Sequence, residues 1–380
     1  MSNGGLKALL PDGLRDGLPP DAAHEAAIVA RLLSSFESHG YARVAPPMVE
    51  FEDTLLDGAA TSIANATFRL MDPVSQRMMG VRADMTIQVA RIATTRLANA
   101  PRPLRLAYAG QVLRVRGSQL RPEREFRQAG VELIGAAEPA ADAEAIMLAV
   151  SALTGVGVSE LSVDINLPTL VPTVCAALQL DDVTTERLRL ALDRKDAEAV
   201  AAIEDGRGLF SALLRATGPA DSALAVLNRL ELPDDALPDC ARLAAVIDLL
   251  RESPETLMIT IDPVEHRGFE YHSGLSFTVF ARGVRGEIGR GGRYRTGADE
   301  AATGFSLFLD SIMRAVPAPN AGTKLFLPFG TDPLEAAKLR SAGWIATAGL
   351  TDVPDSAAEA RRLGCSHVLD NGQAVPLDSD

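Results

Sequence analysis

The chain has 380 residues, 47% of them hydrophobic, and acidic side chains outnumber basic ones by 50 to 37, which gives a formal net charge of -13. A charge of this sign disfavours a phosphate backbone, so we expect no nucleic-acid partner. Cys175, Cys240 and Cys365 are too few and too far apart for a disulfide framework or a zinc site, and we expect no metal. No apolar run reaches transmembrane length and the first residues lack an apolar signal segment. We therefore expect a soluble, cytoplasmic protein with no membrane partner.

The first hundred residues predict a mixture of helices and strands. Residues 1–20 are rich in Gly and Pro, and Asp21 is expected to cap a helix over 22–39. A strand interrupted by Pro46 and Pro47 follows, and residues 68–81 have the pattern of a hairpin. A second helix is expected to begin near Asp84.

The second half of the chain has a different character. Residues 168–254 are rich in Ala and Leu without strand alternation, which predicts an all-helical insertion. Strand patterns return from 257 to 294, and residues 304–316 read as a strand that turns into a helix. After a linker, residues 324–370 follow a β-α-β-α-β pattern. We therefore expect a main domain over 1–317 and a small C-terminal α/β unit over 318–380.

The stretch from 104 to 135 reads as two strands joined by a charged loop. In the second strand Phe126, Gln128, Gly130, Glu132 and Ile134 fall on one face by the period of two. Gln128 and Glu132 are expected to stand roughly 13 Å apart with the gap at Gly130 between them, as the floor of a polar pocket with room for a ligand. The alternative is a strand that turns these side chains to solvent.

The glycine-rich stretch GRGGRY, from Gly289 to Tyr294, could suggest a loop that binds phosphate. It lacks the Gly-Lys-Ser/Thr ending and a helix start after it. We therefore expect these glycines to serve the backbone geometry of a tight turn.

Five stretches resemble, in the right order, the motifs of class II aminoacyl-tRNA synthetases of the histidyl type. They are LPDGLRD with the strand ending in PPMVE, VRADMT, GQVLRV to REFRQAGVELIG, HRGFEYHSG, and GRGGRY followed by GFSLFLDSI. The resemblance covers about residues 8 to 317. It implies an α+β fold, with a synthetase-like antiparallel sheet, flanking helices and a helical insertion.

The sequence departs from the synthetases where those enzymes bind ATP. Arg114 matches the arginine of the second motif, but Arg116 stands where the synthetases have a glutamate. The final Gly-Leu-Glu-Arg of the third motif is replaced by residues 308–311, Phe-Leu-Asp-Ser. Ser311 lacks the charged fork of arginine that grips phosphate, and Phe308 would fill space left open by glycine. The C-terminal unit also looks too short for an anticodon-binding domain, so we expect no aminoacylation.

This pattern of retained and lost residues resembles the regulatory subunits of ATP phosphoribosyltransferase. Members of that family keep the synthetase-like histidine pocket and work with a separate short catalytic subunit in histidine biosynthesis. The resemblance implies a dimer within a hetero-octamer, activation of the catalytic subunit, and a part in feedback inhibition by L-histidine. It implies no catalytic residues and no cofactor in this chain.

The resemblance also implies which residues bind histidine. Asp84, Thr86 and Gln128 match the residues that bind the amino group, and Glu132 matches the acceptor for the imidazole N–H. Arg267, assisted by Arg114, matches the carboxylate end, while Tyr271 and His272 occupy two adjacent positions that are aromatic in the family. Structural roles stay open for some of these residues. Asp84 could be only a helix cap, Arg267 a surface arginine and His272 a packed strand residue.

Two other functions remain in view. The chain could be a histidyl-tRNA synthetase with an aberrant active site, against which Arg116, Ser311 and the short C-terminal unit argue. It could also be a synthetase-like protein with another task, either a stand-alone histidine sensor or an enzyme that attaches an amino acid to a protein.

Overall fold

The computed structural model describes residues 9–57, 61–117, 121–203, 208–252, 257–265, 272–316 and 323–377. The chain divides into two compact units, residues 1–317 and 318–380. Arg267 and Tyr271, two of the predicted histidine-binding residues, lie outside the described residues.

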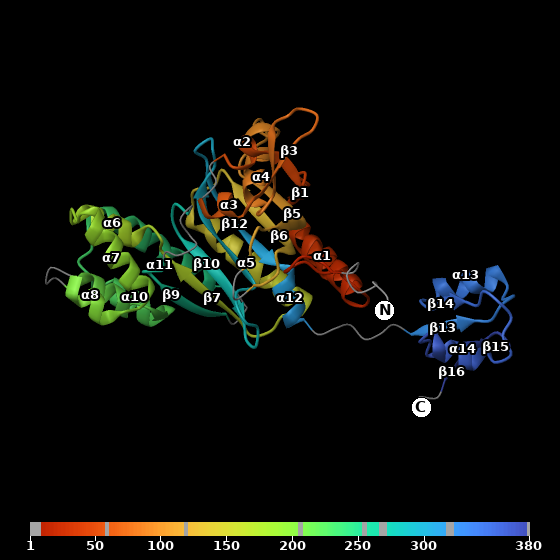
Figure 1. The fold of residues 1–380 in the computed structure, drawn as a ribbon. Coiled ribbons are helices and arrows are strands. Elements are labelled where there is room, and N and C mark those ends of the chain that lie inside the picture. Colours follow the sequence, from red (N-terminus) through yellow and green to blue (C-terminus); the bar gives the residue numbers. More distant parts are fainter. Residues whose placement is uncertain are drawn as a thin grey trace, which may run out of the picture. The chain divides into compact units, whose positions relative to one another are not determined.

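A nine-stranded sheet forms the centre of the large unit, in the order β1-β5-β6-β12-β11-β10-β7-β9-β8 (Figure 1). In chain order the strands are β1 (Ala42–Arg43), β5 (Leu104–Leu113), β6 (Glu125–Ile134), β7 (Leu161–Asn166), β8 (Gly218–Pro219), β9 (Met258–Asp262), β10 (Ser276–Ala281), β11 (Gly289–Arg295) and β12 (Ala301–Phe308). Neighbouring strands run antiparallel except β1 with β5 and β7 with β9. The predicted α+β class with a mainly antiparallel sheet is confirmed.

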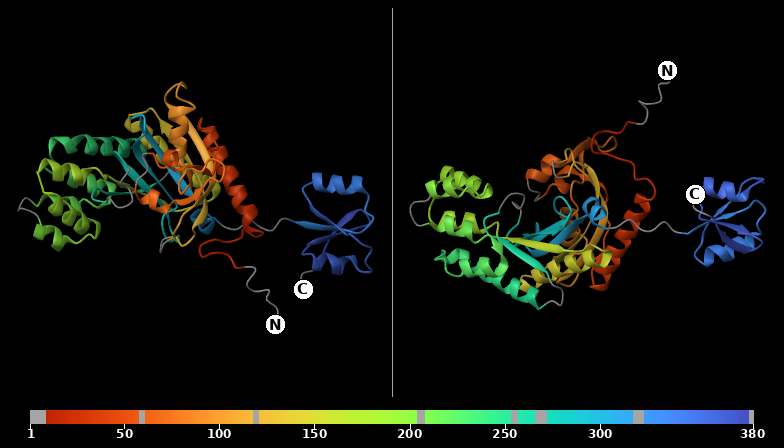
Figure 2. Two further views of the ribbon diagram at one scale, coloured as in Figure 1. Left: turned by 45° about the horizontal axis from the view of Figure 1, so that its top comes forward. Right: turned by 90° about the horizontal axis from the view of Figure 1, so that it is seen from below.

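Two long helices cover one face of this sheet (Figure 2). α1 (Asp21–Ser38) contacts β5 and β6, and α5 (Pro139–Val156) contacts β12 and β11, while the two helices also contact each other. The short helix α12 (Leu309–Ala315), which directly follows β12 as predicted, lies against α1. Ala129, Val131 and Leu133 of β6 belong to this core.

Helix α5 is long and apolar enough to cross a membrane by length and composition, which the sequence analysis did not anticipate. Most of its side chains are buried inside the unit, including Ile146, Leu148 and Leu153. These contacts are those of a helix in the core of the unit.

The opposite face of the sheet carries α4 (Thr86–Thr95), which contacts β5 and β6. The hydrophobic core between α4 and the sheet includes Met85, Val89 and Phe126. Because Phe126 and Ile134 belong to this second core, the predicted division of β6 into two faces is confirmed. Gln128, Gly130 and Glu132 therefore share the face that α4 covers.

A three-stranded sheet, β2 (Val49–Phe51), β4 (Met78–Val81) and β3 (Phe68–Met71), stands beside the large one, and two short helices, α2 (Glu52–Leu55) and α3 (Thr61–Ala66), lie between β2 and β3 in the sequence. β3 and β4 pair from Phe68 with Val81 to Met71 with Met78, so the predicted hairpin is confirmed. The predicted cap of α1 is wrong by one residue. Pro20 occupies the N-cap, and Asp21 is the first helical residue, where its carboxylate still lies near the positive end of the helix.

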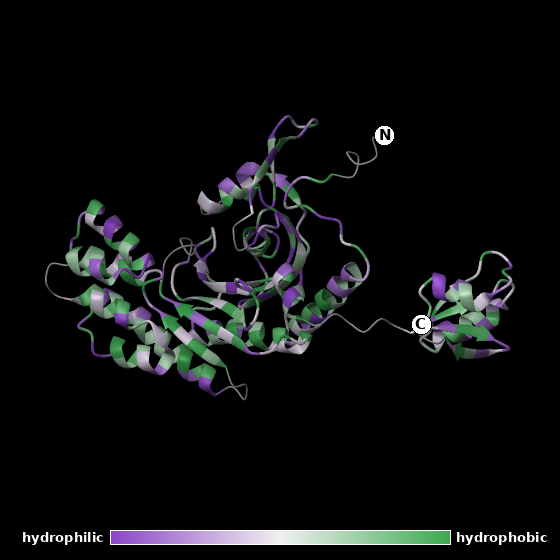
Figure 3. Ribbon diagram, turned by 60° about the horizontal axis from the view of Figure 1, so that its bottom comes forward, coloured by the Kyte–Doolittle hydropathy of each residue, from purple (hydrophilic) through white to green (hydrophobic). Residues whose placement is uncertain are grey.

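The region 168–254 is almost entirely helical. It contains α6 (Leu170–Ala177), α7 (Asp182–Asp193), α8 (Ala197–Ile203), α9 (Leu209–Arg215), α10 (Ala220–Leu227), a 3-10 turn η2 (Asp234–Ala236) and α11 (Leu237–Arg251). Hydrophobic and hydrophilic bands alternate along these helices (Figure 3). The expectation of helices alone is wrong at Gly218 and Pro219, which form β8 and pair with β9. Two residues are too few for an alternating pattern to appear in the sequence.

The small unit is a four-stranded sheet in the order β14-β13-β15-β16 with helices α13 and α14. Its elements are β13 (Lys324–Leu327), α13 (Pro333–Ser341), β14 (Ile345–Ala348), α14 (Ser356–Arg362), β15 (His367–Asp370) and β16 (Gln373–Pro376). The described pattern contains the predicted β-α-β-α-β order, and β16 adds an antiparallel hairpin strand to it.

Candidate ligand-binding site

The site is built from side chains on four neighbouring strands, on the face that α4 covers. In one row across the sheet, Tyr108 of β5 is paired with Gly130 of β6, and Gly130 with Ser306 of β12. In the next row, Glu132 of β6 is paired with Gly304 of β12. These pairings bring together residues from three distant parts of the sequence.

Glu132 is buried and accepts two hydrogen bonds. The hydroxyl of Tyr108 donates to Oε1 over 3.2 Å, and the hydroxyl of Tyr294 on β11 donates to Oε2 over 2.8 Å. Burial raises the pKa of Glu132 to about 8, although the hydrogen bond from Tyr294 acts in the opposite direction. A Cβ atom at Gly304 would lie 2.2 Å from Glu132 Oε2, so the absence of a side chain there makes room for the carboxyl group.

Gln128 is completely buried and its amide is held from three sides. Its Nε2 donates to Asp84 Oδ2 over 2.8 Å and to Ser306 Oγ over 2.6 Å, while its Oε1 accepts from the backbone N–H of Met85 over 3.0 Å. The solvent-facing alternative for Gln128 and Glu132 is therefore wrong.

The expected gap at Gly130 is also wrong. A Cβ atom at this position would lie 2.6 Å from the Tyr108 hydroxyl, which occupies the space next to the glycine. That hydroxyl also lies 2.9 Å from Ser306 Oγ and 3.3 Å from Thr86 Oγ1. Gly130 thus makes room for a protein side chain and not for a ligand.

Asp84 and Thr86 lie together at the start of α4. Asp84 Oδ1 accepts from the backbone N–H of Thr86 over 2.8 Å, and its other oxygen accepts from Gln128. Met85 occupies the N-cap position. Asp84 thus supports the start of the helix, in line with the alternative role of a helix cap. It also lines the two cavities described below.

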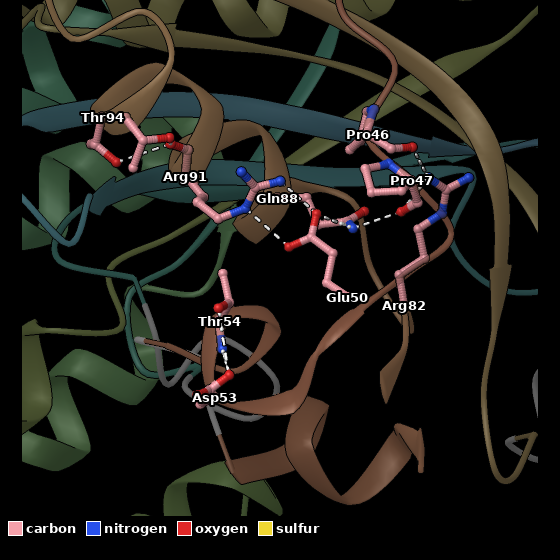
Figure 4. Close-up of polar contacts among 10 residues, drawn as sticks. Pro46, Pro47, Glu50, Asp53, Thr54, Arg82, Gln88, Arg91 and Thr94 are labelled. Atoms are coloured by element: carbon pink, nitrogen blue, oxygen red, sulfur yellow. Dashed lines mark hydrogen bonds and ion pairs between the residues drawn. The ribbon is translucent and has the colours of Figure 1, made fainter. Parts of the chain in front are cut away.

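A network of polar contacts holds α4 in place (Figure 4). Arg91 donates to both carboxylate oxygens of Glu50 on β2, over 3.0 and 2.5 Å. Gln88 donates to Glu50 over 2.8 Å and to the carbonyl of Pro47 over 2.8 Å. Because Gln88 and Arg91 belong to α4, the network fixes the helix whose first turn carries Thr86.

Two cavities meet at Asp84. The smaller has a volume of about 40 Å³ and is lined by Glu132, Tyr294, Thr86 and Ser306 among others. The larger has a volume of about 670 Å³ and is lined by Arg114 and Arg290 among others. Ile63, Asp84 and Arg290 line both. The smaller has room for roughly three water molecules, about the size of one small ring, so a whole amino acid would extend beyond it.

Six of the residues predicted to bind histidine are described by the structure. It brings together four of them, Asp84, Thr86, Gln128 and Glu132. Gln128 lies behind Asp84 and Ser306, to which it donates hydrogen bonds. Arg114 lines the larger cavity, where its Nε donates to the carbonyl of Ala83 over 3.3 Å. His272 is buried and does not line either cavity itself, but it lies against Gly292, which is part of the wall of the smaller cavity.

The glycines of GRGGRY lie inside β11, so the predicted tight turn is wrong. Gly292 has φ +152°, and a Cβ atom there would meet the His272 ring at 2.6 Å. Close approach of neighbouring groups, not a chain reversal, requires these glycines. Among the described residues, no group of three or more His, Cys, Asp or Glu side chains is arranged to hold a metal ion.

Comparison with known proteins places this geometry in a family. A family model described as histidyl-tRNA synthetase matches residues 13–312. A protein of Rhodospirillum centenum named ATP phosphoribosyltransferase regulatory subunit is 56% identical over 368 residues, which cover 96% of this chain and 95% of that protein. A protein of the same name from Paramagnetospirillum magneticum is 53% identical over 97% of this chain and 98% of that protein. The chain belongs to the family of ATP phosphoribosyltransferase regulatory subunits. Its role is accordingly a regulatory one in histidine biosynthesis.

Solved structures agree on the fold of this regulatory-subunit family. A crystal structure from Bacillus halodurans, described as an ATP phosphoribosyltransferase regulatory subunit/histidyl-tRNA synthetase, has a TM-score of 0.81 at 23% identity and covers 93% of this chain and 96% of that one. Histidyl-tRNA synthetase from Nostoc has a TM-score of 0.77 at 18% identity, covering 95% and 90%. The predicted class II synthetase-like fold is confirmed.

Sequence reasoning missed Tyr108, Tyr294 and Ser306, which hold Glu132 and Gln128. Tyr108 alternates with Leu104 and Leu106, a signal that puts it on one face of its strand but leaves open which residue it meets. Tyr294 is 162 residues from Glu132 in the sequence and Ser306 is 178 residues from Gln128, so their partners follow only from the strand register.

Proposed function

We propose that this chain is a regulatory subunit without catalytic activity of its own, which activates a short-form ATP phosphoribosyltransferase catalytic subunit and makes it sensitive to L-histidine. The proposal includes a dimer of this chain within a hetero-octamer in the cytoplasm, and no nucleic-acid partner. The observation that carries it is the buried carboxyl of Glu132 in the wall of a ring-sized cavity that shares Asp84 with the larger cavity.

The chemistry of the site supports histidine as the ligand. Glu132 offers a fixed acceptor for an imidazole N–H, and Asp84 offers an acceptor for an ammonium group. The wider cavity offers Arg114 for a carboxylate. Our proposed histidine-binding set consists of Asp84, Thr86, Arg114, Gln128, Glu132, Arg267, Tyr271 and His272.

The surroundings of the former third motif support a role other than adenylation. Phe308 is buried, and its ring packs edge-on against Phe126 at 5.9 Å between centroids. The guanidinium of Arg121 lies 3.8 Å above the Phe308 ring. Ser311 is also buried and accepts from Arg314 over 3.0 Å. A phosphate-gripping arginine is replaced here by a side chain engaged in local packing.

The test is the phosphoribosyltransferase activity of the short catalytic subunit from the same organism, assayed with and without this chain. We expect activation on mixing and inhibition when histidine is added. Glu132→Gln should preserve activation and weaken inhibition by about tenfold or more, because one charge-assisted hydrogen bond is worth roughly 1.5–3 kcal/mol. No activation and no co-elution at excess subunit would overturn the partnership. Histidine binding by the chain alone would then favour a stand-alone sensor.

A further inference from the structure

A buried group of three charged side chains ties the helical insertion to the central sheet. Asp142, in the first turn of α5, is 1% exposed, and two arginines meet its carboxylate. Arg293 of β11 donates from Nε to Oδ1 over 3.0 Å, and Arg242 of α11 donates to Oδ2 over 2.8 Å. One carboxylate therefore connects a strand of the sheet, a core helix and a helix of the insertion.

The same two arginines hold the chain that leads into α5. Arg293 donates to the carbonyl of Ala136 over 2.9 Å, and Arg242 donates to the carbonyl of Ala137 over 2.6 Å. Arg293 is itself only 6% exposed. Removing one partner from such a buried pair leaves an uncompensated charge, so the geometry of the group is strongly held. The positions of α5, α11 and β11 therefore depend on one another.

The junction between α11 and β11 contains a cavity. α11 packs along α5 (Figure 1), but a volume of about 470 Å³ lies between the start of α11 and the end of β11. Its wall includes Arg242 of α11 together with Arg293 and Tyr294 of β11. A cavity does not transmit a displacement as packed side chains do, so the link across this junction runs through Arg242 and Asp142.

The next residue of β11 belongs to the proposed histidine pocket. Successive residues of a strand face opposite sides of the sheet, so Tyr294 points away from Asp142, into the core that contains Met85. Its hydroxyl donates to Glu132 Oε2 over 2.8 Å. Such a bond weakens once the two oxygens are more than about 3 Å apart, so a small shift of β11 at Arg293 would weaken it.

We propose that Asp142 is a positioning residue of the histidine pocket, which sets the place of the Tyr294 hydroxyl through Arg293 and couples the helical insertion to Glu132 through Arg242. The inference rests on the proposed function, because it assigns a regulating contact to the same pocket. By linkage the coupling is reciprocal. A partner that displaces α11 weakens histidine binding, and bound histidine holds α11 in place.

Calorimetric titration of the full-length chain with histidine tests the coupling in a double-mutant cycle. Asp142→Asn would leave two guanidinium groups without a carboxylate and destabilise the fold, so Arg242→Gln, whose side chain is 24% exposed, carries the test. We expect Tyr294→Phe to weaken histidine binding by about tenfold and Arg242→Gln by about threefold. The double variant should lose only about tenfold, because Arg242 acts through the hydroxyl that Tyr294→Phe removes. A loss of about thirtyfold, the product of two independent effects, would overturn the proposal.

Arg251→Gln is the matched control on the same helix. The side chain of Arg251 is 46% exposed and pairs with Asp248 of α11 and Asp221 of α10, so the substitution removes the same charge but only contacts within the insertion. It should leave histidine affinity unchanged. Equal weakening by Arg242→Gln and Arg251→Gln, or no weakening by either, would contradict the role of Asp142.

The ionisation of Glu132 provides a second readout that needs no bound histidine. The hydrogen bond from Tyr294 lowers the pKa of Glu132 and so opposes the effect of burial. Arg242→Gln should therefore raise the Glu132 pKa further, and should have no such effect in a chain that carries Tyr294→Phe. Carbon NMR of the carboxyl group, assigned with Glu132→Gln, measures this shift. The same shift in both backgrounds would overturn the coupling, whereas the expected shift without any histidine binding would overturn the sensing function alone.

Discussion

At the scale of single residues, Glu132 combines two demands that oppose each other. A carboxylate is a strong acceptor for an imidazole N–H, but ionisation inside a protein is unfavourable without compensation. Hydrogen bonds from Tyr108 and Tyr294 supply part of that compensation. The remaining cost appears as a pKa of about 8, so a bound imidazole N–H must displace the proton that the carboxyl of the free protein holds near neutral pH.

This raised pKa predicts how stability depends on pH. Glu132 has a pKa near 4.5 in the unfolded chain and about 8 in the folded one, so the folded chain carries the extra proton between these values. Stability from this group is fully present below pH 4.5, falls as pH rises through that window, and levels off above pH 8. The total change is on the order of a few kcal/mol. Glu132→Gln, which cannot ionise, should remove this part of the slope in urea denaturation measured between pH 6 and 9.

The exposed Glu37 of α1 provides the control for that experiment. Glu37→Gln removes one ionisable carboxyl without touching the pocket and should retain the wild-type slope. If Glu132→Gln and the wild type lose stability in parallel between pH 6 and 9, Glu132 is ionised in the folded protein and our account of its burial is wrong.

At the scale of secondary-structure elements, the position of α4 depends on Glu50. The Arg91–Glu50 ion pair is largely buried, with side-chain exposures of 23% and 8%. Glu50→Ala should lower the free energy of unfolding by about 1–3 kcal/mol, because it leaves Arg91 without its carboxylate acceptor and Gln88 with the Pro47 carbonyl alone. It should also weaken histidine binding, since Thr86 and the adjacent Asp84 move with the helix. Urea denaturation and calorimetric titration measure the two effects.

Glu52→Ala is the matched control for Glu50→Ala. Glu52 pairs with Arg69 at 2.6 Å, but the two side chains are 29% and 41% exposed. Exposed pairs contribute up to about 1 kcal/mol, so this substitution should change both measurements little. A Glu50→Ala variant that behaves like Glu52→Ala would show that the network does not position α4.

The strands β5 and β6 show which features of the site could be predicted from the sequence and which could not. The period-two pattern of β6 correctly assigned Ala129 and Val131 to one core and Phe126 to the other, because alternation is a property of one strand. What fills the space beside Gly130 depends on the register between β5 and β6, which a single strand does not encode. For the same reason, the sequence did not reveal that Gly304 lies against Glu132. It also led us to predict a gap for a ligand at the place where the Tyr108 hydroxyl lies.

At the scale of the whole molecule, the two units have separate hydrophobic cores. The cores around Phe305 and around Met85 consist of residues from the large unit alone. The two cores on either side of β13, which include Leu325 and Phe326, consist of residues after 322 alone. Each unit therefore has a hydrophobic core of its own, which is what cooperative folding of a domain requires.

Separate cores predict two thermal transitions in scanning calorimetry, of which histidine shifts only one. A ligand that binds the folded large unit stabilises that unit by about 2.7 kcal/mol at a hundred times its dissociation constant. The transition of the large unit should then rise by several degrees, while the transition of residues 318–380 stays in place. Glu132→Gln should reduce the histidine-induced rise and leave the transition of the small unit unchanged. If histidine moved both transitions together, the two units would fold as one cooperative block, and the small unit would contribute to the stability of the ligand-bound state.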